Sequence, residues 1–171
     1  MSATMRKGVD RRTLLKGLGG VGAAGVLGFP VIVRGQAKEI KIGSVQPMTG
    51  ELAVVGKTAR QANQLAVDHV NAAGGIKSLG GAKLVLVPGD HQKKPEVARA
   101  ETERLLAEGV HALVGAFDSG AINAMIQAIK QSTKPVPLVI DVGSADQLTQ
   151  QGVKYVFRVF TTNDTMGRNG I

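Results

Sequence analysis

The sequence predicts an α/β fold: a doubly wound parallel sheet of five strands, in the order 2-1-3-4-5, with helices on both faces. Two observations carry this prediction. From residue 39 onward, short runs of aliphatic residues alternate with longer segments whose apolar residues recur at helical spacing. The composition, 43% hydrophobic and 20% charged with no cysteine, is that of a globular chain that needs no disulfides.

The first three elements expected are a strand, a helix and a second strand. Residues Glu39–Val45 alternate apolar and polar side chains, which is typical of a strand. Residues Lys57–Ala73 place alanines and valine on one helical face, and the glycine pair that begins at Gly74 ends the helix. Residues Lys83–Val87, with the sequence KLVLV, form the second expected strand.

The middle of the chain repeats this alternation. Pro95 suits the first turn of a second helix, and Gly109 ends it. Residues Ala112–Ala116 form a buried third strand. The next helix has its apolar face at Ile122 and at the residues three and four positions further on, and Ser119 is well placed to cap its N-terminus.

Two more strands, Pro137–Ile140 and Tyr155–Val159, complete the sheet, with a short helical turn near Asp146–Thr149 between them. A last helix is expected to begin at Asn163 or Asp164, and the sequence stops about two turns later. A helix of that length buries little surface, so we expect residues 38–171 to be the N-terminal lobe of a longer protein.

Residues 1–37 have the three-part form of an export signal. A basic start is followed by an apolar, glycine-rich run over Thr13–Val33, and small residues at Gly35 and Ala37 fit a signal peptidase. The segment RRTLLK, residues 11–16, resembles the twin-arginine signal. We therefore predict export to the periplasm and removal of the signal, without a lipid anchor because there is no cysteine.

Charge and motifs exclude several function classes. The net charge is +8, but residues 1–37 contribute +5 of it, and no basic stripe with interleaved aromatic residues follows, so we predict no nucleic-acid partner. The G-x-G-x-x-G pattern at residues 17–22 has no strand before it, so we predict no dinucleotide cofactor. No cluster of His, Asp and Glu has the spacing of metal ligands.

The candidate site follows from the expected strand order. In doubly wound sheets, ligands bind beyond the carboxyl ends of the strands where the order reverses, here between strands one and three. Three loops meet there: residues 46–50, 116–120 and 141–146. They supply the hydroxyl groups of Thr49, Ser119 and Ser144. Hydroxyl groups beside a helix N-terminus suit an anion such as a carboxylate.

A different class of function, a secreted serine hydrolase, would use Ser119 as nucleophile. The base would have to be a histidine, and of the three in the chain only His91 is expected at the same edge of the sheet. The sequence around Ser119 also lacks the G-x-S-x-G pattern, because Phe117 stands in place of the first glycine. We keep this hypothesis as the less favoured alternative.

Four segments together resemble the first lobe of a type I periplasmic binding protein of the leucine/isoleucine/valine-binding family. They are IKIGSVQPMTGELAVVG, LAVDHVNAAGGI, LVGAFDSG and LTQQGVKYVFRVFTTND. The resemblance runs from about Glu39 to Ile171 and depends on the order and spacing of the segments. It implies no enzymatic activity. It implies two lobes that close by hinge bending around a ligand, and docking of the closed form on the permease of an ABC importer.

The resemblance also implies roles for particular residues. Ser119 and Ser144 correspond to the residues that hold the carboxylate of the ligand. The backbone carbonyl near Val142 corresponds to one that receives an ammonium group, and Val55 corresponds to a residue that lines the side-chain pocket.

Two acids depart from the family pattern. Asp118 and Asp141 lie near the proposed anion site, either as turn caps and solvated loop acids or as cleft residues that favour a cationic or hydroxyl-bearing ligand. The identity of the ligand therefore stays open. A ligand-sensing receptor domain of the same fold remains an alternative to transport.

Overall fold

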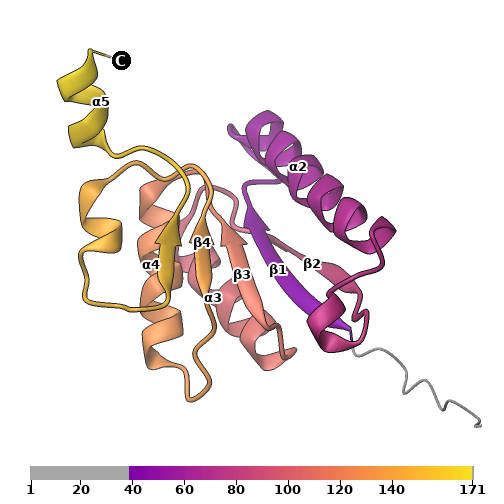
Figure 1. Ribbon diagram of the computed structural model, residues 1–171. Helices are drawn as coiled ribbons and strands as arrows, with labels where there is room; N and C mark the ends of the chain where they lie inside the picture. The colour runs from indigo at the N-terminus through magenta and orange to yellow at the C-terminus, as the bar shows by residue number, and fades with distance from the viewer. Residues whose placement is uncertain (1–38, 171) are drawn as a thin grey trace, which may run out of the picture. The chain divides into compact units, whose positions relative to one another are not determined.

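The computed structural model describes residues 39–170. The predicted twin-arginine signal lies outside these residues. The described part contains a five-stranded sheet in the order β2-β1-β3-β4-β5, in which all neighbouring strands are parallel (Figure 1). The predicted fold class and strand order are therefore confirmed.

The elements follow the expected alternation. The strands are β1 (Ile40–Gln46), β2 (Leu84–Asp90), β3 (Ala112–Gly115), β4 (Leu138–Ile140) and β5 (Val156–Arg158). The α-helices are α2 (Ala53–Ala72), α3 (Pro95–Ala107), α4 (Ser119–Gln131) and α5 (Asn163–Asn169). Two short 3₁₀ helices are η1 (Lys77–Leu79) and η2 (Asp146–Thr149). None of the helices within residues 39–170 combines the length and apolar character needed to cross a bilayer.

Two predicted boundaries were wrong by more than two residues. Helix α2 begins at Ala53 rather than Lys57, because Gly56 lets its first turn lie against the preceding loop: a Cβ on Gly56 would stand 2.0 Å from the carbonyl oxygen of Pro47. Strand β2 continues to Asp90 rather than ending at Val87. Proline has no backbone N–H to donate. Pro88 is tolerated in β2 because this strand lies at the edge of the sheet, with no further strand beside it that would need that hydrogen bond.

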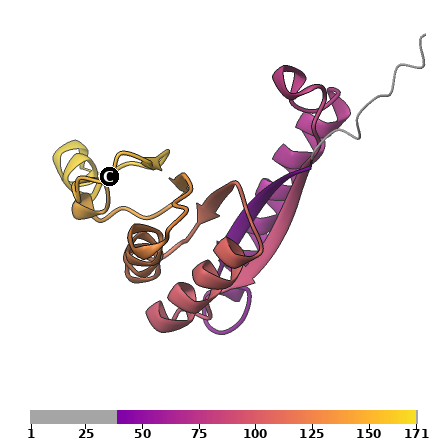
Figure 2. The ribbon, with the colours of Figure 1, turned by 90° about the horizontal axis from the view of Figure 1, so that it is seen from below.

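Alternate residues of β1 face two different layers, as the period of a strand requires. Ser44 is fully buried under α2, where Arg60 donates to its hydroxyl (3.2 Å) and its carbonyl (2.9 Å) and Asn63 donates to its hydroxyl (3.1 Å). Val45 belongs instead to the hydrophobic core beneath α3 and α4. Figure 2 shows α3 and α4 side by side.

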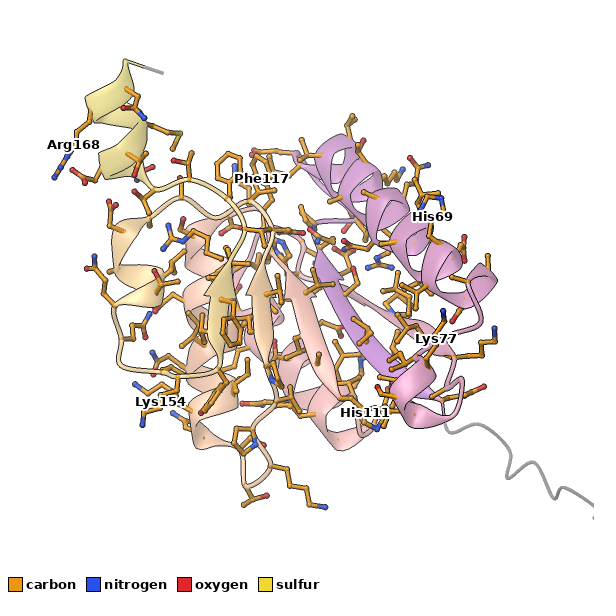
Figure 3. All side chains as sticks on the ribbon, in the orientation of Figure 1. His69, Lys77, His111, Phe117, Lys154 and Arg168 are labelled. Carbon is orange, nitrogen blue, oxygen red and sulfur yellow. The ribbon has the colours of Figure 1, made fainter. Side chains whose placement is uncertain are left out.

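Because the strands are parallel, all their carboxyl ends lie at one edge of the sheet. Phe117 follows β3 at this edge, whereas His111 precedes β3 at the opposite edge (Figure 3). His69 lies on α2. Two of the three histidines are thus separated from the loops in which the site was predicted.

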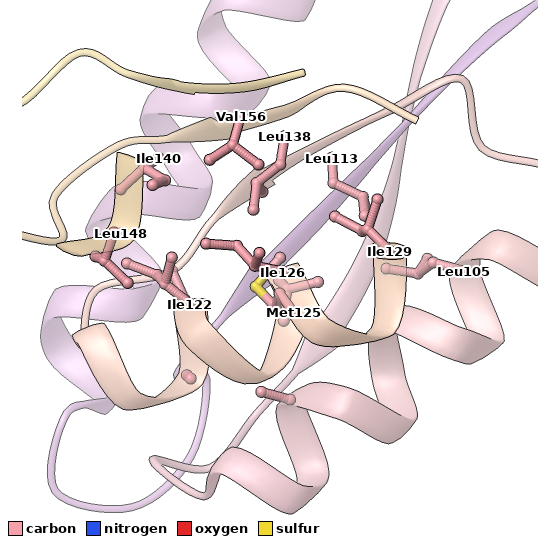
Figure 4. Packing of buried hydrophobic residues seen from close by; sticks show 14 of the residues in the cluster. Leu105, Leu113, Ile122, Met125, Ile126, Ile129, Leu138, Ile140, Leu148 and Val156 are labelled. Atoms are coloured by element: carbon pink, nitrogen blue, oxygen red, sulfur yellow. The ribbon is translucent and has the colours of Figure 1, made fainter. Parts of the chain in front are cut away.

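The core lies between the sheet and the helices α3 and α4. Helix α4 contributes its whole apolar face, with Ile122, Met125, Ile126 and Ile129 fully buried (Figure 4). Leu138 and Ile140 of β4 pack against these residues from the sheet. The N-terminus of α4 is therefore held rigidly beside the carboxyl ends of β3 and β4.

Candidate functional site

The N-terminus of α4 is capped by Asp118, so the prediction that Ser119 caps it was wrong. Asp118 has the extended backbone of an N-cap, and its Oδ1 accepts from the N–H of Ala121 at 2.9 Å. Ser119 is the first residue of the helix. A carboxylate at this position also complements the positive end of the helix dipole.

The Ser119 hydroxyl instead links α4 to the loop that carries Ser144. Its Oγ accepts from the N–H of Ala145 at 3.3 Å. In the same loop Gly143 approaches α4 so closely that a Cβ would stand 2.0 Å from Cδ1 of Ile122. The structure therefore brings together Ser119 and the Ser144 loop, as the strand order predicted.

The Ser144 loop is also fixed from its other side. The carbonyl of Ser144 accepts from the N–H of Asn163 (2.9 Å) and from the guanidinium of Arg158 (3.1 Å). Within residues 39–170 the hydroxyl of Ser144 has no hydrogen-bond partner. The backbone that carries this hydroxyl is held by the two hydrogen bonds to its carbonyl.

A side-chain bridge crosses the end of β3. Gln46, the last residue of β1, is fully buried, and its Nε2 donates to Oδ2 of Asp141, which follows β4. Gln46 Oε1 and Asp141 Oδ1 are buried without a partner among the described residues. Burial raises the pKa of Asp141, and the hydrogen bond from Gln46 opposes this shift only in part. Asp141 is therefore a half-buried acid with a buried Oδ1 atom, rather than a solvated loop residue.

Beside α4 lies a second buried titratable group, His91. Its side chain is fully buried, and Nδ1 lies 3.6 Å from Oδ2 of Asp118. Burial lowers the pKa of His91, and the nearby carboxylates, Asp118 first among them, oppose the shift. Nδ1 accepts from the N–H of Lys93 at 3.2 Å, as expected for a neutral ring.

The hydrolase hypothesis requires a histidine that accepts a hydrogen bond from the Ser119 hydroxyl. No histidine in residues 39–170 is hydrogen-bonded to the Ser119 hydroxyl, which accepts from Ala145 instead. His91, the one candidate base, is directed at Asp118 and Lys93. The described residues therefore do not form the serine–histidine pair that nucleophilic catalysis requires.

The side chain of Thr49 is hydrogen-bonded to Asp90, the last residue of β2. Its hydroxyl donates to Oδ2 of Asp90 at 2.7 Å, while Oδ1 accepts from the N–H groups of Met48 (2.9 Å) and Gln92 (3.0 Å). Burial raises the pKa of Asp90, but these hydrogen bonds outweigh it and lower the pKa below its ordinary value. Asp90 thus fixes the loop after β1. The predicted ligand contact of Thr49 stays a prediction.

Two further predicted site residues lie near this edge. Val55 is in the first turn of α2 and is 36% exposed, and Val142 is half-buried in the Ser144 loop. Their contacts with a ligand also stay predictions. Sequence reasoning missed Gln46, although its position was a signal: it continues the buried face that Ser44 occupies on β1.

The described residues match the model of a protein family over nearly their whole length. The family is described as periplasmic binding protein, and the match covers residues 39–170. The chain belongs to this family. Its members are binding proteins rather than enzymes, so the hydrolase alternative is set aside.

Curated members of the family are similar in sequence. The Leu/Ile/Val-binding protein homolog 8 of Brucella abortus is 36% identical over 135 residues, which cover 78% of this chain and 32% of that protein. The Leu/Ile/Val-binding protein homolog 7 of Brucella melitensis is 34% identical over 122 residues, covering 70% and 29%. The chain therefore spans about a third of the length of the curated relatives it matches.

Solved structures of the family share the fold. The branched-chain amino acid transporter substrate binding protein LivJ from Streptococcus pneumoniae, in complex with isoleucine, matches with a TM-score of 0.66 at 34% identity, covering 73% of this chain and 34% of that one. An ABC transporter solute binding protein from R. palustris, in complex with benzoate, matches with a TM-score of 0.66 at 26% identity, covering 76% and 35%. These matches confirm the predicted resemblance.

Proposed function

We propose that the chain is the first lobe of an extracytoplasmic solute-binding protein of an ABC importer, which captures a small amino-acid-like or carboxylate ligand between two lobes. One observation carries the proposal: the Ser119 hydroxyl, the first turn of α4 and the Ser144 loop converge at the carboxyl edge of the sheet. This edge is where doubly wound sheets bind their ligands.

The arrangement suits the carboxylate of a ligand. The first N–H groups of a helix have no partner within the helix and form, with its dipole, a site for an anion. Asp118 takes only the N–H of Ala121, and its Oδ2 is buried near His91. The hydroxyl groups of Ser119 and Ser144 add two donors, and the Val142 carbonyl is the acceptor proposed for an ammonium group.

The ligands of two similar proteins support this class of ligand. Isoleucine and benzoate, bound by the S. pneumoniae and R. palustris proteins, differ in every group except a carboxylate joined to an apolar body. We propose that the same two parts define the ligand of this chain. Val55 on α2 then borders the apolar body, and Thr49 closes the site at the end of β1.

We propose the periplasm as the location of the protein and the permease subunits of the importer as its partners. The twin-arginine segment at residues 11–16 would direct the protein to the periplasm, where closure of a second lobe over the ligand would create the form that binds the permease subunits. A receptor domain that senses the same ligand without transport would use the same site.

The test is calorimetric titration of the full-length protein with isoleucine, leucine and benzoate. Isoleucinol and benzyl alcohol, which lack the carboxylate, are the matched controls. We expect saturable binding of at least one carboxylate and none of its alcohol. Equal binding of an acid and its alcohol would contradict the carboxylate site.

A further inference from the structure

Arg158 is the last residue of β5, and its guanidinium donates hydrogen bonds to several backbone carbonyl groups of the Ser144 loop, residues 141–146. Its Nη1 donates to the carbonyl of Ser144 at 3.1 Å. Its Nη2 lies within hydrogen-bond distance of the carbonyls of Ala145 (2.9 Å) and Asp146 (3.3 Å) and of the Thr149 hydroxyl (3.0 Å). One half-buried side chain thus holds three successive carbonyls and the 3₁₀ helix that follows them.

The peptide bond between Ser144 and Ala145 connects Arg158 to the candidate site. The C=O and N–H of a trans peptide lie in one plane and point in opposite directions. Here the C=O accepts from Arg158 and from the N–H of Asn163, while the N–H donates to Ser119 Oγ. The orientation of this plane therefore determines where Ser144 stands relative to Ser119.

We infer that Arg158 is a positioning residue for ligand binding, which sets the geometry between Ser119 and Ser144 without touching the ligand. The inference rests on the proposed function. A planar guanidinium presents donors in a fixed fork, whereas a lysine ammonium is a single flexible point charge. Lysine at position 158 keeps the charge but cannot hold three carbonyls in one orientation.

Hydrogen exchange tests the positioning without any ligand. In Arg158→Lys, we expect amide exchange within residues 142–149 and at Asn163 to accelerate by at least about tenfold while the amides of β1 and β3 keep their rates. Arg168→Lys is the matched control, because Arg168 is 77% exposed and, among residues 39–170, pairs only with the side chain of Asp164. Unchanged exchange in Arg158→Lys would overturn the inference.

Calorimetry then tests the consequence for binding. With isoleucine and benzoate as probes, we expect Arg158→Lys in the full-length protein to lose about tenfold or more in affinity. Ser144→Ala should cost markedly less in the Arg158→Lys background than in the parent, because the two residues act through one peptide plane. A general loss of stability would leave the cost of Ser144→Ala unchanged, and additive losses would overturn the inference.

Failure of the proposed function and failure of the positioning role of Arg158 give different results. If the parent protein binds neither probe, the proposed function fails, and the exchange rates alone decide whether Arg158 holds the loop. If Arg158→Lys does not fold, Thr149→Val removes one acceptor of the guanidinium and should give a smaller acceleration in the same segment. No acceleration in a folded Thr149→Val and full binding by it would overturn the inference.

Discussion

Gln46 donates a hydrogen bond from its side-chain amide to the carboxylate of Asp141, and so joins the ends of β1 and β4 across the end of β3. The two residues are 95 positions apart in the sequence. The bridge places an acid, with its pKa raised by burial, at the base of the site proposed for a carboxylate. Its protonation should therefore affect the stability of the lobe.

Asp141→Asn should stabilise the protein near neutral pH. An unfolded aspartate titrates at a pKa of about 3.9, and in the folded protein the pKa of Asp141 is raised. Between these two pKa values the folded state holds a proton that the unfolded state has lost, so the free energy of unfolding falls as pH rises through this window and stays lower above it. Because asparagine does not ionise, the variant lacks this decrease in the free energy of unfolding with rising pH.

The measurement is urea denaturation of both proteins at a series of pH values from 3 to 8. Asp68→Asn is the control, because Asp68 is an exposed acid on α2. We expect the stability gain of Asp141→Asn to grow with pH and then level off. A gain independent of pH would show that the raised pKa of Asp141 is not its cause.

His91 should make the protein less stable in mild acid. Because burial lowers its pKa in the folded state, protonation is easier in the unfolded chain, whose histidine titrates at a pKa of about 6.5. The free energy of unfolding should fall as pH drops below this value, and be unaffected by this group above it. The measurement is urea denaturation at a series of pH values. His91→Gln should flatten the dependence of the free energy of unfolding on pH between about pH 6.5 and 5. His69→Gln, at an exposed position, is the control and should leave this dependence as in the parent.

Substitutions at the first two positions of the α4 N-terminus should affect different properties, stability for Asp118 and ligand binding for Ser119. Asp118→Ala removes the N-cap and should lower the free energy of unfolding by about 1 kcal/mol. Ser119→Ala should lower it less, but should weaken ligand binding about ten- to a hundredfold by removing a charge-assisted hydrogen bond. Thermal melting and calorimetric titration of both variants separate the roles. If Ser119→Ala binds its best ligand as tightly as the parent, Ser119 does not hold the ligand.

Gly143→Ala should destabilise the protein by about 1–3 kcal/mol, because the new Cβ would collide with Cδ1 of Ile122. Ile122→Val removes that methyl group and should recover part of the loss in the double variant. Gly167→Ala is the control, since nothing lies within 4 Å of a Cβ at that position. Equal effects of the two alanine substitutions on the melting temperature would contradict the predicted collision.

Export should depend on the arginine pair at residues 11 and 12. Changing both Arg11 and Arg12 to lysine keeps the positive charge but removes the twin-arginine motif. We expect the variant to stay in the cytoplasm, as measured by immunoblotting of periplasmic and cytoplasmic fractions. Undiminished export would indicate another route or the lack of a signal.

The sequence by itself determined the fold and which loops meet at the carboxyl edge of the sheet. The alternation of aliphatic runs with helical periodicity fixes an α/β sheet, and that sheet brings the loops after β1, β3 and β4 to one edge. These features depend on local patterns and on general rules of connection. Ser119 and the Ser144 loop could therefore be predicted to meet from one sequence.

Only the tertiary structure decided which group each polar side chain would contact. Asp118 and Ser119 are both good N-cap residues. In the structure Asp118 caps the helix, while the hydroxyl of Ser119 accepts a hydrogen bond from the N–H of Ala145. Likewise Asp90 engages Thr49, and Arg158 holds the Ser144 loop. Hydrogen bonds are directional and short, so the partner of a polar group depends on packing between segments far apart in the chain, which local sequence patterns do not encode.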